Sequence, residues 1–535
     1  MQTTRTSIPA KPNRPAAIRR AAPLLLLALL TLATLGCQSG NAVDPLGPDP
    51  TADAGLPPVP RELRGVWVAS VANIDWPSAP GLTPAQQRAE LVFLLDTCVE
   101  LNLNAVILQV RPACDALYDS PIEPWSSYLT SAEGEPPVPH YDPLAFAVTE
   151  AHTRGLELHA WFNPFRAGHA SFRGEHAAGH ISNTHPHLVR TYGRQLWLDP
   201  GDAEARAHSL AVIRDVVERY DIDGVHLDDY FYPYPVSDAG NTIDFPDDAT
   251  YKRYRETGGT LTRDDWRRDN VNTFVRDLYA AVKERKPHVQ VGISPFGIYR
   301  PGHPAYVRGF DQYDRIYADA KRWLDAGWCD YFVPQLYWAI DNPDQSFTGL
   351  LRWWHTHNAG GRHVYPGLYT SRTEDGSARA FRATEIPYQV EWSRILADEA
   401  GVAQGHVHFS MRALLQNRAG LADTLDREHY AEPALSPASP WLSDKRPEPP
   451  QPDLGYTVAS GLLHVSVAPH SLTGARAWVV QAQRSGVWAY DIFPAHASRV
   501  ALPLPGDGPV ERVAVWSVDR AGIGSAVVEV PADDS

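Results

Sequence analysis

The fold of this chain is decided by the stretch Asp223-Gly-Val-His-Leu-Asp-Asp-Tyr-Phe-Tyr-Pro-Tyr-Pro235, a short apolar strand that ends on two carboxylates and an aromatic loop. Successive side chains of a strand point to opposite faces, so Val225 and Leu227 share one face while His226 and Asp228 share the other. In a parallel barrel the apolar pair packs under helices and the polar pair points inward. Barrel enzymes keep their chemistry at the carboxyl ends of such strands, so the two carboxylates are candidate site residues. Their alternative roles are to cap the next helix or to bind a structural cation.

On both sides of this stretch, short apolar strands alternate with helical patterns, which is typical of βα units on a parallel sheet. The expected strands are 65–69, 105–110, 157–162, 223–228, 290–295, 331–336, 363–368 and 405–410. The expected helices are 83–101, 143–152, 203–220, 263–285, 313–326, 347–357, 385–400 and a closing helix near Leu421. This pattern predicts an α/β fold, a TIM (β/α)8 barrel over residues 61–430. An open doubly wound sheet is the alternative, but no Gly-rich phosphate fingerprint follows the first strand.

The carboxyl-terminal part of the chain has a different pattern. Residues 431–453 carry seven Pro residues among Ser, Glu and Asp, which predicts a stiff linker. Residues 454–535 contain about seven period-two strands separated by turns. They predict a small β-sandwich similar to a fibronectin type III module, which either binds a ligand or packs beside the barrel; packing is the expected role.

The amino terminus reads as a targeting signal. Arg19-Arg20 precedes an apolar run over residues 21–35 that is too short for a membrane span. The run ends in Leu-Thr-Leu-Ala-Thr-Leu-Gly-Cys, which resembles a bacterial lipobox, so we expect residues 1–36 to be removed and Cys37 to be lipidated. The residue after this Cys is Gln38, which resembles the sorting signal of lipoproteins that go to the outer membrane. It predicts that the protein is anchored in the cell envelope, at the periplasmic face of the outer membrane. A Gram-positive origin would instead leave the protein on the outer face of a single membrane.

Charge and cysteine content narrow the classes of partner. Residues 37–60 are rich in Pro, Gly, Ala and Asp and predict a flexible tether. Removal of residues 1–36 changes the formal net charge from −15 to −20, which argues against nucleic-acid binding. The remaining Cys residues lack metal-ligand spacing and no His-Glu-Xaa-Xaa-His motif is present, so we expect no metal and no cofactor. We expect a monomer.

The strand ends together carry a family resemblance. They resemble the glycosyl hydrolase-like 10 family over about residues 61–430. The matching stretches are Arg64-Gly-Val-Trp-Val-Ala-Ser, Gln109-Val-Arg-Pro, Asp115-Ala-Leu-Tyr118, Pro124-Trp125-Ser126, Ala160-Trp161-Phe162-Asn163-Pro164, Asp223 to Pro233, Gly292-Ile-Ser-Pro-Phe-Gly297 and Pro334-Gln335-Leu336-Tyr337-Trp338. The resemblance implies a TIM barrel that acts on a polysaccharide. A lipoprotein branch, the divisome-associated glycosidases, is linked to peptidoglycan strands stripped of peptide, and this lipobox-bearing chain is similar to that branch.

The carboxylate pair suggests a mechanism. Most glycosidases need two carboxyl groups across the scissile bond. The strand is similar to strand four of α-amylase-type barrels, whose acid is a Glu at the end of strand five, but here that strand ends in Ser294-Pro295-Phe296. The two adjacent Asp residues resemble instead those of hexosaminidases that use substrate assistance. In these enzymes the 2-acetamido oxygen of the sugar attacks the anomeric carbon. In that scheme Asp228 orients the acetamido group and Asp229 donates the proton, which requires the chain to turn at Asp229.

Several alternatives stay open at this stage. The acid can come from another loop, with Asp75, Asp115, Glu123 and Asp341 as candidates. Expected substrate contacts are Arg111, Asn163, His226, Tyr232, Gln335, Tyr337, Trp338, Trp76 and Asp75, with Trp125 and Trp161 as further stacking candidates; each can instead satisfy buried groups or fill the core. The competing functions are a tethered, non-catalytic glycan-binding protein and a hydrolase of another polysaccharide. A clustered carboxylate pair favours catalysis, because mutual repulsion costs stability that pure binding does not require.

Overall fold

The computed structural model describes residues 50–532 apart from 173, 239 and 454. The predicted signal peptide and Cys37 lie outside the described residues. Residues 50–60, expected to be tether, are packed: α1 (Pro50–Asp53) precedes the buried residues Leu56 and Val59. Gln481 Nε2 of the C-terminal domain donates to Pro57 O at 2.9 Å. These residues are therefore part of the folded structure rather than a flexible tether.

The main sheet has nine parallel strands in the order β12-β11-β10-β7-β3-β2-β1-β14-β13. Their bounds are β1 (Glu62–Val68), β2 (Ala105–Arg111), β3 (Glu157–Phe162), β7 (Gly224–Leu227), β10 (Gln290–Ile293), β11 (Tyr331–Phe332), β12 (His363–Val364), β13 (Gly367–Leu368) and β14 (Gln404–His408). The two end strands are consecutive in the chain, because only Tyr365 and Pro366 separate β12 from β13. The sheet therefore curls into a TIM-barrel-like form.

Six helices cover this sheet close to their predicted positions: α2 (Pro84–Glu100), α4 (Pro143–Thr153), α6 (Ala203–Arg219), α8 (Arg263–Arg285), α11 (Phe347–Thr356) and α12 (Glu385–Ala400). The single helix expected over 313–326 is wrong. The chain forms α9 (Gln312–Arg315) and α10 (Ala320–Asp325) instead. Tyr317 between them has a φ of +57°, which an α-helix does not accept, and its hydroxyl receives a hydrogen bond from Arg267 Nη1 at 2.6 Å. The tertiary contact outweighs the local helical pattern.

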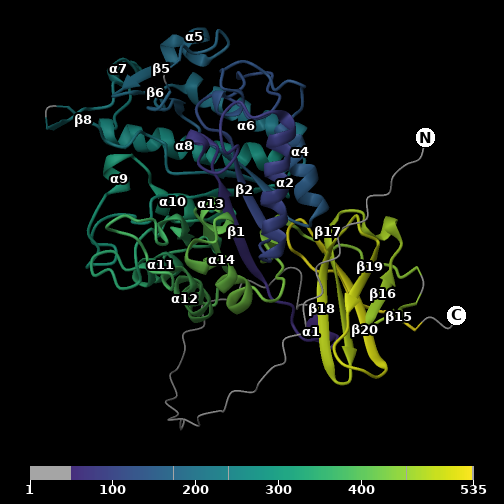
Figure 1. Ribbon diagram of the computed structural model, residues 1–535. Helices are drawn as coiled ribbons and strands as arrows, with labels where there is room; N and C mark the ends of the chain where they lie inside the picture. The colour runs from purple at the N-terminus through teal and green to yellow at the C-terminus, as the bar shows by residue number, and fades with distance from the viewer. Residues whose placement is uncertain (1–49, 173, 239, 454, 533–535) are drawn as a thin grey trace.

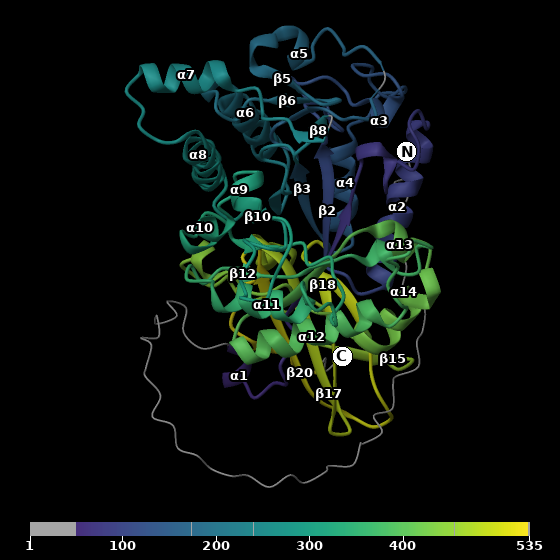
Figure 2. The same cartoon turned by 90° about the vertical axis from the view of Figure 1, so that its left-hand side faces the viewer.

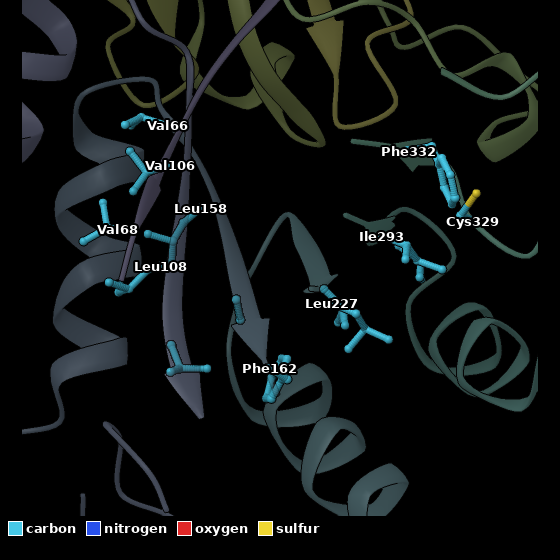
Figure 3. Close-up of a cluster of buried hydrophobic side chains, with 14 of the residues drawn as sticks. Val66, Val68, Val106, Leu108, Leu158, Phe162, Leu227, Ile293, Cys329 and Phe332 are labelled. Atoms are coloured by element: carbon cyan, nitrogen blue, oxygen red, sulfur yellow. The ribbon is translucent and has the colours of Figure 1, made fainter. Parts of the chain in front are cut away.

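The two faces of β7 confirm the expected alternation. Val225 and Leu227 belong to the large apolar cluster that also contains residues of α6 and α8. Figure 3 shows this outward row continuing through Val106, Leu158 and Ile293 on the neighbouring strands. His226 points the other way, into the interior, where its ring meets Trp67 at 5.8 Å between ring centroids.

Long insertions lie at the end of the sheet where the strands have their carboxyl ends. After β3 come β4 (Arg166–Gly168), α5 (Ile181–Thr184), β5 (Val189–Tyr192) and β6 (Gln195–Leu198). After β7 come β8 (Ser237–Asp238), β9 (Asn241–Thr242) and α7 (Asp248–Glu256). Both views place α5, β5 and β6 at the opposite end of the molecule from the C-terminal strands (Figures 1 and 2).

The C-terminal domain consists of two small antiparallel sheets. One sheet contains β15 (Thr457–Ala459), β16 (Leu462–Ser466) and β19 (Arg499–Pro503); the other contains β17 (Ala475–Arg484), β18 (Val487–Pro494), β20 (Val510–Asp519) and β21 (Val528–Glu529). Buried residues of both sheets share one apolar cluster, among them Leu463, Leu502, Trp478 and Val515. Among the described residues, no helix combines the length and the apolarity needed to cross a membrane.

This domain packs against the amino ends of the main-sheet strands. Arg476 Nη1 lies 3.1 Å from Glu157 Oε1, and Arg520 lies 2.6 Å from Asp221. Residues 431–453 also pack rather than span open solvent: Leu435 is buried, and Trp441 Nε1 donates to Asp330 Oδ1 at 2.8 Å. The contacts leave the opposite end of the sheet, toward α5, β5 and β6, uncovered by this domain (Figure 1). The carboxylate pair directly follows the carboxyl end of β7 and so belongs to that uncovered end.

Candidate active site

The chain leaves β7 and bends at Asp229, so both neighbouring carboxylates are drawn into the molecule. Asp228 is 5% exposed and Asp229 is 3% exposed. The backbone N–H of Tyr230 donates to Asp228 Oδ1 at 3.3 Å, and the Tyr234 hydroxyl donates to Asp229 Oδ2. The bend thus provides the turn that a joint role for two adjacent residues requires.

The pair is arranged to hold a proton near neutral pH. Burial raises the pKa of Asp228 to about 7, and the neighbouring Asp229 charge adds to the rise. Burial also raises the pKa of Asp229, whereas hydrogen bonds from Tyr234 and Gln335 lower it. Two interacting carboxyls titrate as a unit, and the donors on Asp229 favour its charged form. The pair as a whole therefore retains a proton near neutral pH in the free protein.

Asn163 and Arg166 support Asp228 from the end of β3. Asn163 Nδ2 lies 3.3 and 3.4 Å from the two carboxylate oxygens of Asp228. Asn163 Oδ1 accepts from the Arg166 backbone N–H at 3.1 Å. The Arg166 guanidinium lies 4.9 Å from the Tyr230 ring centroid, and its charge lowers the pKa values of both Asp228 and Asp229. Sequence reasoning missed Arg166; its place three residues after Asn163 was the available signal.

Trp161 presents its polar edge rather than its ring to the pair. The side chain is 6% exposed and belongs to the inward-facing apolar cluster. Its indole Nε1 has no hydrogen-bond partner among the described residues, yet the group lowers the pKa of Asp228 and so lies beside that carboxyl. A buried donor without an acceptor is costly, and the acceptor beside this one is the Asp228 carboxyl.

The residues expected at the mouth after β11 are half-buried around the pair. Gln335 approaches Asp229, and its Nε2 donates to Ser294 O at 3.1 Å. Burial raises the pKa of Tyr337, and the Asp229 charge adds to the rise, so its hydroxyl stays protonated beside the carboxylates. Trp338 lies further out, with its ring centroid 5.5 Å from that of Phe296.

Arg111 was expected to contact substrate, but its donors are already used. It is fully buried and donates to both carboxylate oxygens of Glu123 at 2.6 and 2.7 Å. It also donates to Asn163 O at 2.6 Å, to Pro164 O at 3.0 Å and to Cys114 Sγ at 3.2 Å. A guanidinium has five N–H donors, so none is left for a sugar. Arg111 instead holds the backbone of Asn163 in place.

Asp75 and Trp76 also have structural partners. Asp75 accepts from Ala69 N at 2.8 Å, Ser410 Oγ at 2.7 Å and Arg412 N at 2.8 Å, which ties the loop after β1 to α13 (Met411–Leu415). Trp76 is 1% exposed, and its Nε1 donates to Gln87 O at 2.9 Å. Neither side chain is available to a substrate.

His226 and Tyr232 lie in the interior as well. His226 Nε2 accepts from Trp67 Nε1 at 3.1 Å, its Nδ1 lies 3.0 Å from the Tyr331 hydroxyl, and burial lowers its pKa. Tyr232 is 1% exposed and packs edge-on against Phe245 and Tyr317. Of the expected substrate contacts, the structure therefore brings together Asn163, Gln335 and Tyr337 at the pair, with Trp338 nearby.

The alternative acids differ in their surroundings. Burial alone would raise the pKa of Glu123, but Arg111 and His208 bring it down to about 2, so this carboxyl stays ionised. Burial raises the pKa of Asp115 to about 6, and the Glu133 charge adds to the rise. Asp341 is exposed.

Away from the pair, Glu133, His176 and His180 form the group with metal-ligand spacing in the described part of the chain.

Comparisons with known proteins agree with the strand-end motifs. The sequence profile of the glycosyl hydrolase-like 10 family matches residues 62–377. The chain is 41% identical over 401 residues to glycosyl hydrolase YngK of Bacillus subtilis, covering 73% of this chain and 76% of that protein. It is 34% identical over 365 residues to glycosyl hydrolase DigH of Escherichia coli K12, covering 64% and 80%. Among solved structures, the glycoside hydrolase domain of PgaB from Bordetella bronchiseptica has a TM-score of 0.43 at 14% identity, covering 69% of this chain and 98% of that domain.

Proposed function

Because the chain belongs to the glycosyl hydrolase-like 10 family and is a glycoside hydrolase, we propose that it cleaves peptidoglycan glycan strands stripped of peptide. The observation that supports the catalytic part of this proposal is the buried Asp228–Asp229 pair, which retains a proton near pH 7. A polysaccharide that carries 2-acetamido groups suits a site with two adjacent carboxyls and no Glu at the end of the next strand.

The pair supports a substrate-assisted mechanism. Asp228, as the protonated member, donates its proton to the glycosidic oxygen as the bond to the anomeric carbon breaks. The acetamido oxygen of the same sugar attacks that carbon, and ionised Asp229 accepts the acetamido N–H and stabilises the developing positive charge. Water then opens the cyclic intermediate while Asp228 takes back a proton. Asn163, Gln335 and Tyr337, with the Trp161 N–H, offer donors for the sugar oxygens around this centre.

The wider setting is part of the same proposal. The curled parallel sheet closes as a complete (β/α)8 barrel, and the C-terminal sheets form a fibronectin type III-like sandwich. The lipobox at Cys37 supports a lipid anchor at the periplasmic face of the outer membrane, and the acidic surface fits a monomer without nucleic-acid partners. A glycan strand is the only partner that the proposal requires besides the membrane.

Digestion of purified protein tests this function. The chain from Pro50 onward keeps every packed residue described above, so it is incubated with intact peptidoglycan and with amidase-stripped strands. We expect new reducing ends only from stripped strands, and their loss in Asp228→Asn and Asp229→Asn. Binding without new reducing ends would favour a tethered glycan-binding protein, and activity on other polysaccharides alone would replace the proposed substrate.

Two substrates that differ in their leaving group distinguish the roles of the two carboxyls. A nitrophenyl aryl glycoside of N-acetylglucosamine has a leaving oxygen that is acidic enough to depart without protonation. We therefore expect Asp228→Asn to retain much of its activity on the aryl glycoside, while Asp229→Asn loses activity on both substrate types. The opposite pattern would return the acid role to Asp229.

A further inference from the structure

Among the described residues, one buried arginine near the carboxylate pair lacks the partner that the other buried arginines have. Arg166, at the start of β4, is 3% exposed. No carboxylate in the described ranges lies within 4.0 Å of its guanidinium nitrogens. The other buried arginines each form an ion pair at 2.6 or 2.7 Å: Arg64 with Glu62, Arg111 with Glu123, Arg267 with Asp247 and Arg268 with Asp265. A buried cation without a direct partner is costly, so the Arg166 guanidinium is a candidate anion site.

Three contacts hold Arg166 beside the pair. Its backbone N–H donates to Asn163 Oδ1 at 3.1 Å, and Asn163 Nδ2 reaches the Asp228 carboxylate at 3.3 Å. Its Nε donates to Pro112 O at 2.9 Å. The guanidinium carbon lies 4.9 Å from the ring centroid of Tyr230, whose backbone N–H donates to Asp228 Oδ1. The guanidinium is therefore fixed within the site.

The donors of this guanidinium are only partly used. It has five N–H groups; Pro112 O accepts from Nε, and the Tyr230 hydroxyl lies beside another. Nη1 and Nη2 are not sealed from solvent, although the side chain as a whole is buried. At least three N–H groups therefore remain for a ligand. They belong to the planar fork that binds a carboxylate through two parallel hydrogen bonds.

The charge of the molecule gives such a cation a use. The formal net charge of the sequence is −15, and the site itself contains two carboxyls, so an anionic glycan is repelled unless a cation receives it. Amidases hydrolyse the amide bond between the peptide and the lactyl group of muramic acid. A stripped strand therefore carries a free lactyl carboxylate on every second sugar, whereas an intact strand carries a neutral amide at the same position.

We propose that Arg166 binds the lactyl carboxylate of a muramic acid residue in the bound strand and thereby selects strands stripped of peptide. The inference rests on the proposed function, because it names the group of that substrate which the site recognises. Muramic acid alternates along the strand, so a lactyl group lies on, or next to, whichever sugar the pair holds. An amide in its place carries no charge and offers one acceptor oxygen, so the bidentate ion pair is lost.

Two forms of one substrate test this role. Stripped strands are compared with the same strands after their lactyl carboxylates have been converted chemically to primary amides. We expect kcat/KM of the unchanged chain to be roughly 10- to 100-fold lower on the amidated strands. Arg166→Gln is expected to abolish this ratio, and Arg166→Lys, which keeps the charge but not the fork, to reduce it. The ratio is the readout, because the Arg166 charge also acts on the pKa values of the pair.

The control for net charge is Arg194→Gln. Arg194 is exposed in the turn between β5 and β6 of the same insertion. This variant is expected to keep the full ratio of the unchanged chain. Equal kcat/KM of the unchanged chain on the two forms of substrate, or an undiminished ratio in Arg166→Gln, would overturn the proposal.

A binding measurement separates this inference from the proposed hydrolase activity. Asp228→Asn is titrated calorimetrically with a soluble tetrasaccharide of alternating N-acetylglucosamine and muramic acid, in its carboxylate and its amide form. We expect the carboxylate form to bind at least tenfold more tightly, and Arg166→Gln in the same background to remove the preference. This preference without cleavage by the unchanged chain would contradict the hydrolase activity but support the role of Arg166. Equal binding of the two forms would overturn that role, even if the unchanged chain cleaves both.

Discussion

At the residue scale, Tyr234 is the side chain that makes the two carboxyls of the site differ in their tendency to bind a proton. Its hydroxyl donates to Asp229, and this bond favours the charged form of that carboxyl. We expect Tyr234→Phe to raise the pKa of Asp229, to move the acidic limb of the pH–rate profile to higher pH and to lower kcat by roughly 10- to 100-fold.

Tyr232 provides the matched control for this change. It lies two residues earlier, and its hydroxyl has no hydrogen-bond partner among the described residues. Tyr232→Phe is therefore expected to leave the pH profile unchanged. Equal losses in the two variants would mean that the hydroxyl of Tyr234 does not act through Asp229.

The raised pKa of Asp228 also has a cost in stability. Its folded value is about 7 against an ordinary value of 3.8, so between these pH values the folded state binds a proton that the unfolded state does not. The contribution of this group to the free energy of unfolding therefore falls as pH rises from about 4 to 7. We expect Asp228→Asn to be inactive on glycan strands yet more stable than the unchanged chain at pH 8, by roughly 1 to 3 kcal/mol.

Urea unfolding at pH 5 and pH 8 measures this difference. The stabilisation by Asp228→Asn is expected to be much smaller at pH 5, where Asp228 is protonated in the folded protein. An equal effect at both pH values would contradict the raised pKa.

At the scale of elements, the Arg111–Glu123 pair holds the end of β2 to the loop after β3. Both side chains are buried, and Glu123 also contacts His208 Nε2 at 2.8 Å. Glu123→Gln leaves Arg111 with an uncompensated charge, so we expect a loss of about 2 to 4 kcal/mol in the free energy of unfolding. The limbs of the pH–rate profile are expected to stay in place, because a carboxyl with a pKa of about 2 is already ionised across the range of the profile.

The pH dependence of this loss has a definite sign. The pKa of Glu123 is about 2 in the folded protein against 4.5 ordinarily, so its stabilisation is present above about pH 4.5 and declines as pH falls toward 2. Chemical denaturation across this range measures it. The exposed pair Arg352–Glu399, at 2.8 Å, is the control, and Glu399→Gln is expected to cost no more than about 1 kcal/mol.

At the scale of the whole molecule, the C-terminal domain neutralises carboxylates at the amino ends of the strands. Burial alone would raise the pKa of Glu157, but Arg476 and His159 bring it down to about 2. We expect Arg476→Ala to lower the free energy of unfolding by about 2 to 4 kcal/mol, because it leaves Glu157 buried without its main cation. Thermal unfolding measures the loss, and Arg499→Ala on the exposed part of β19 is the control. Equal melting temperatures for both variants would contradict a structural role for the domain contact.

Much of this fold follows from local patterns in the sequence. The alternation of Val225 and Leu227 with His226 and Asp228 predicted which side chains face the helices and which face inward, because a strand has a strict period of two. Helices such as α4 and α8 lie within a residue or two of their predicted ranges, and the structure shows Pro143 in the first turn of α4 and Thr262 as the N-cap of α8. The break at Tyr317 was not predictable, because Arg267 and Tyr232 reach it from other elements.

The sequence by itself determined the family, the parallel sheet and the place of the carboxylate pair, because each depends on residues that are neighbours along the chain. Only the tertiary structure decided what Arg111, Asp75 and Trp76 do, since their hydrogen-bond partners include Asn163 after β3, Ser410 after β14 and Gln87 of α2. It likewise brought Glu133 to His176 and placed Tyr234 on Asp229. Such contacts depend on how loops of different strands meet at one end of a sheet, which no local pattern encodes.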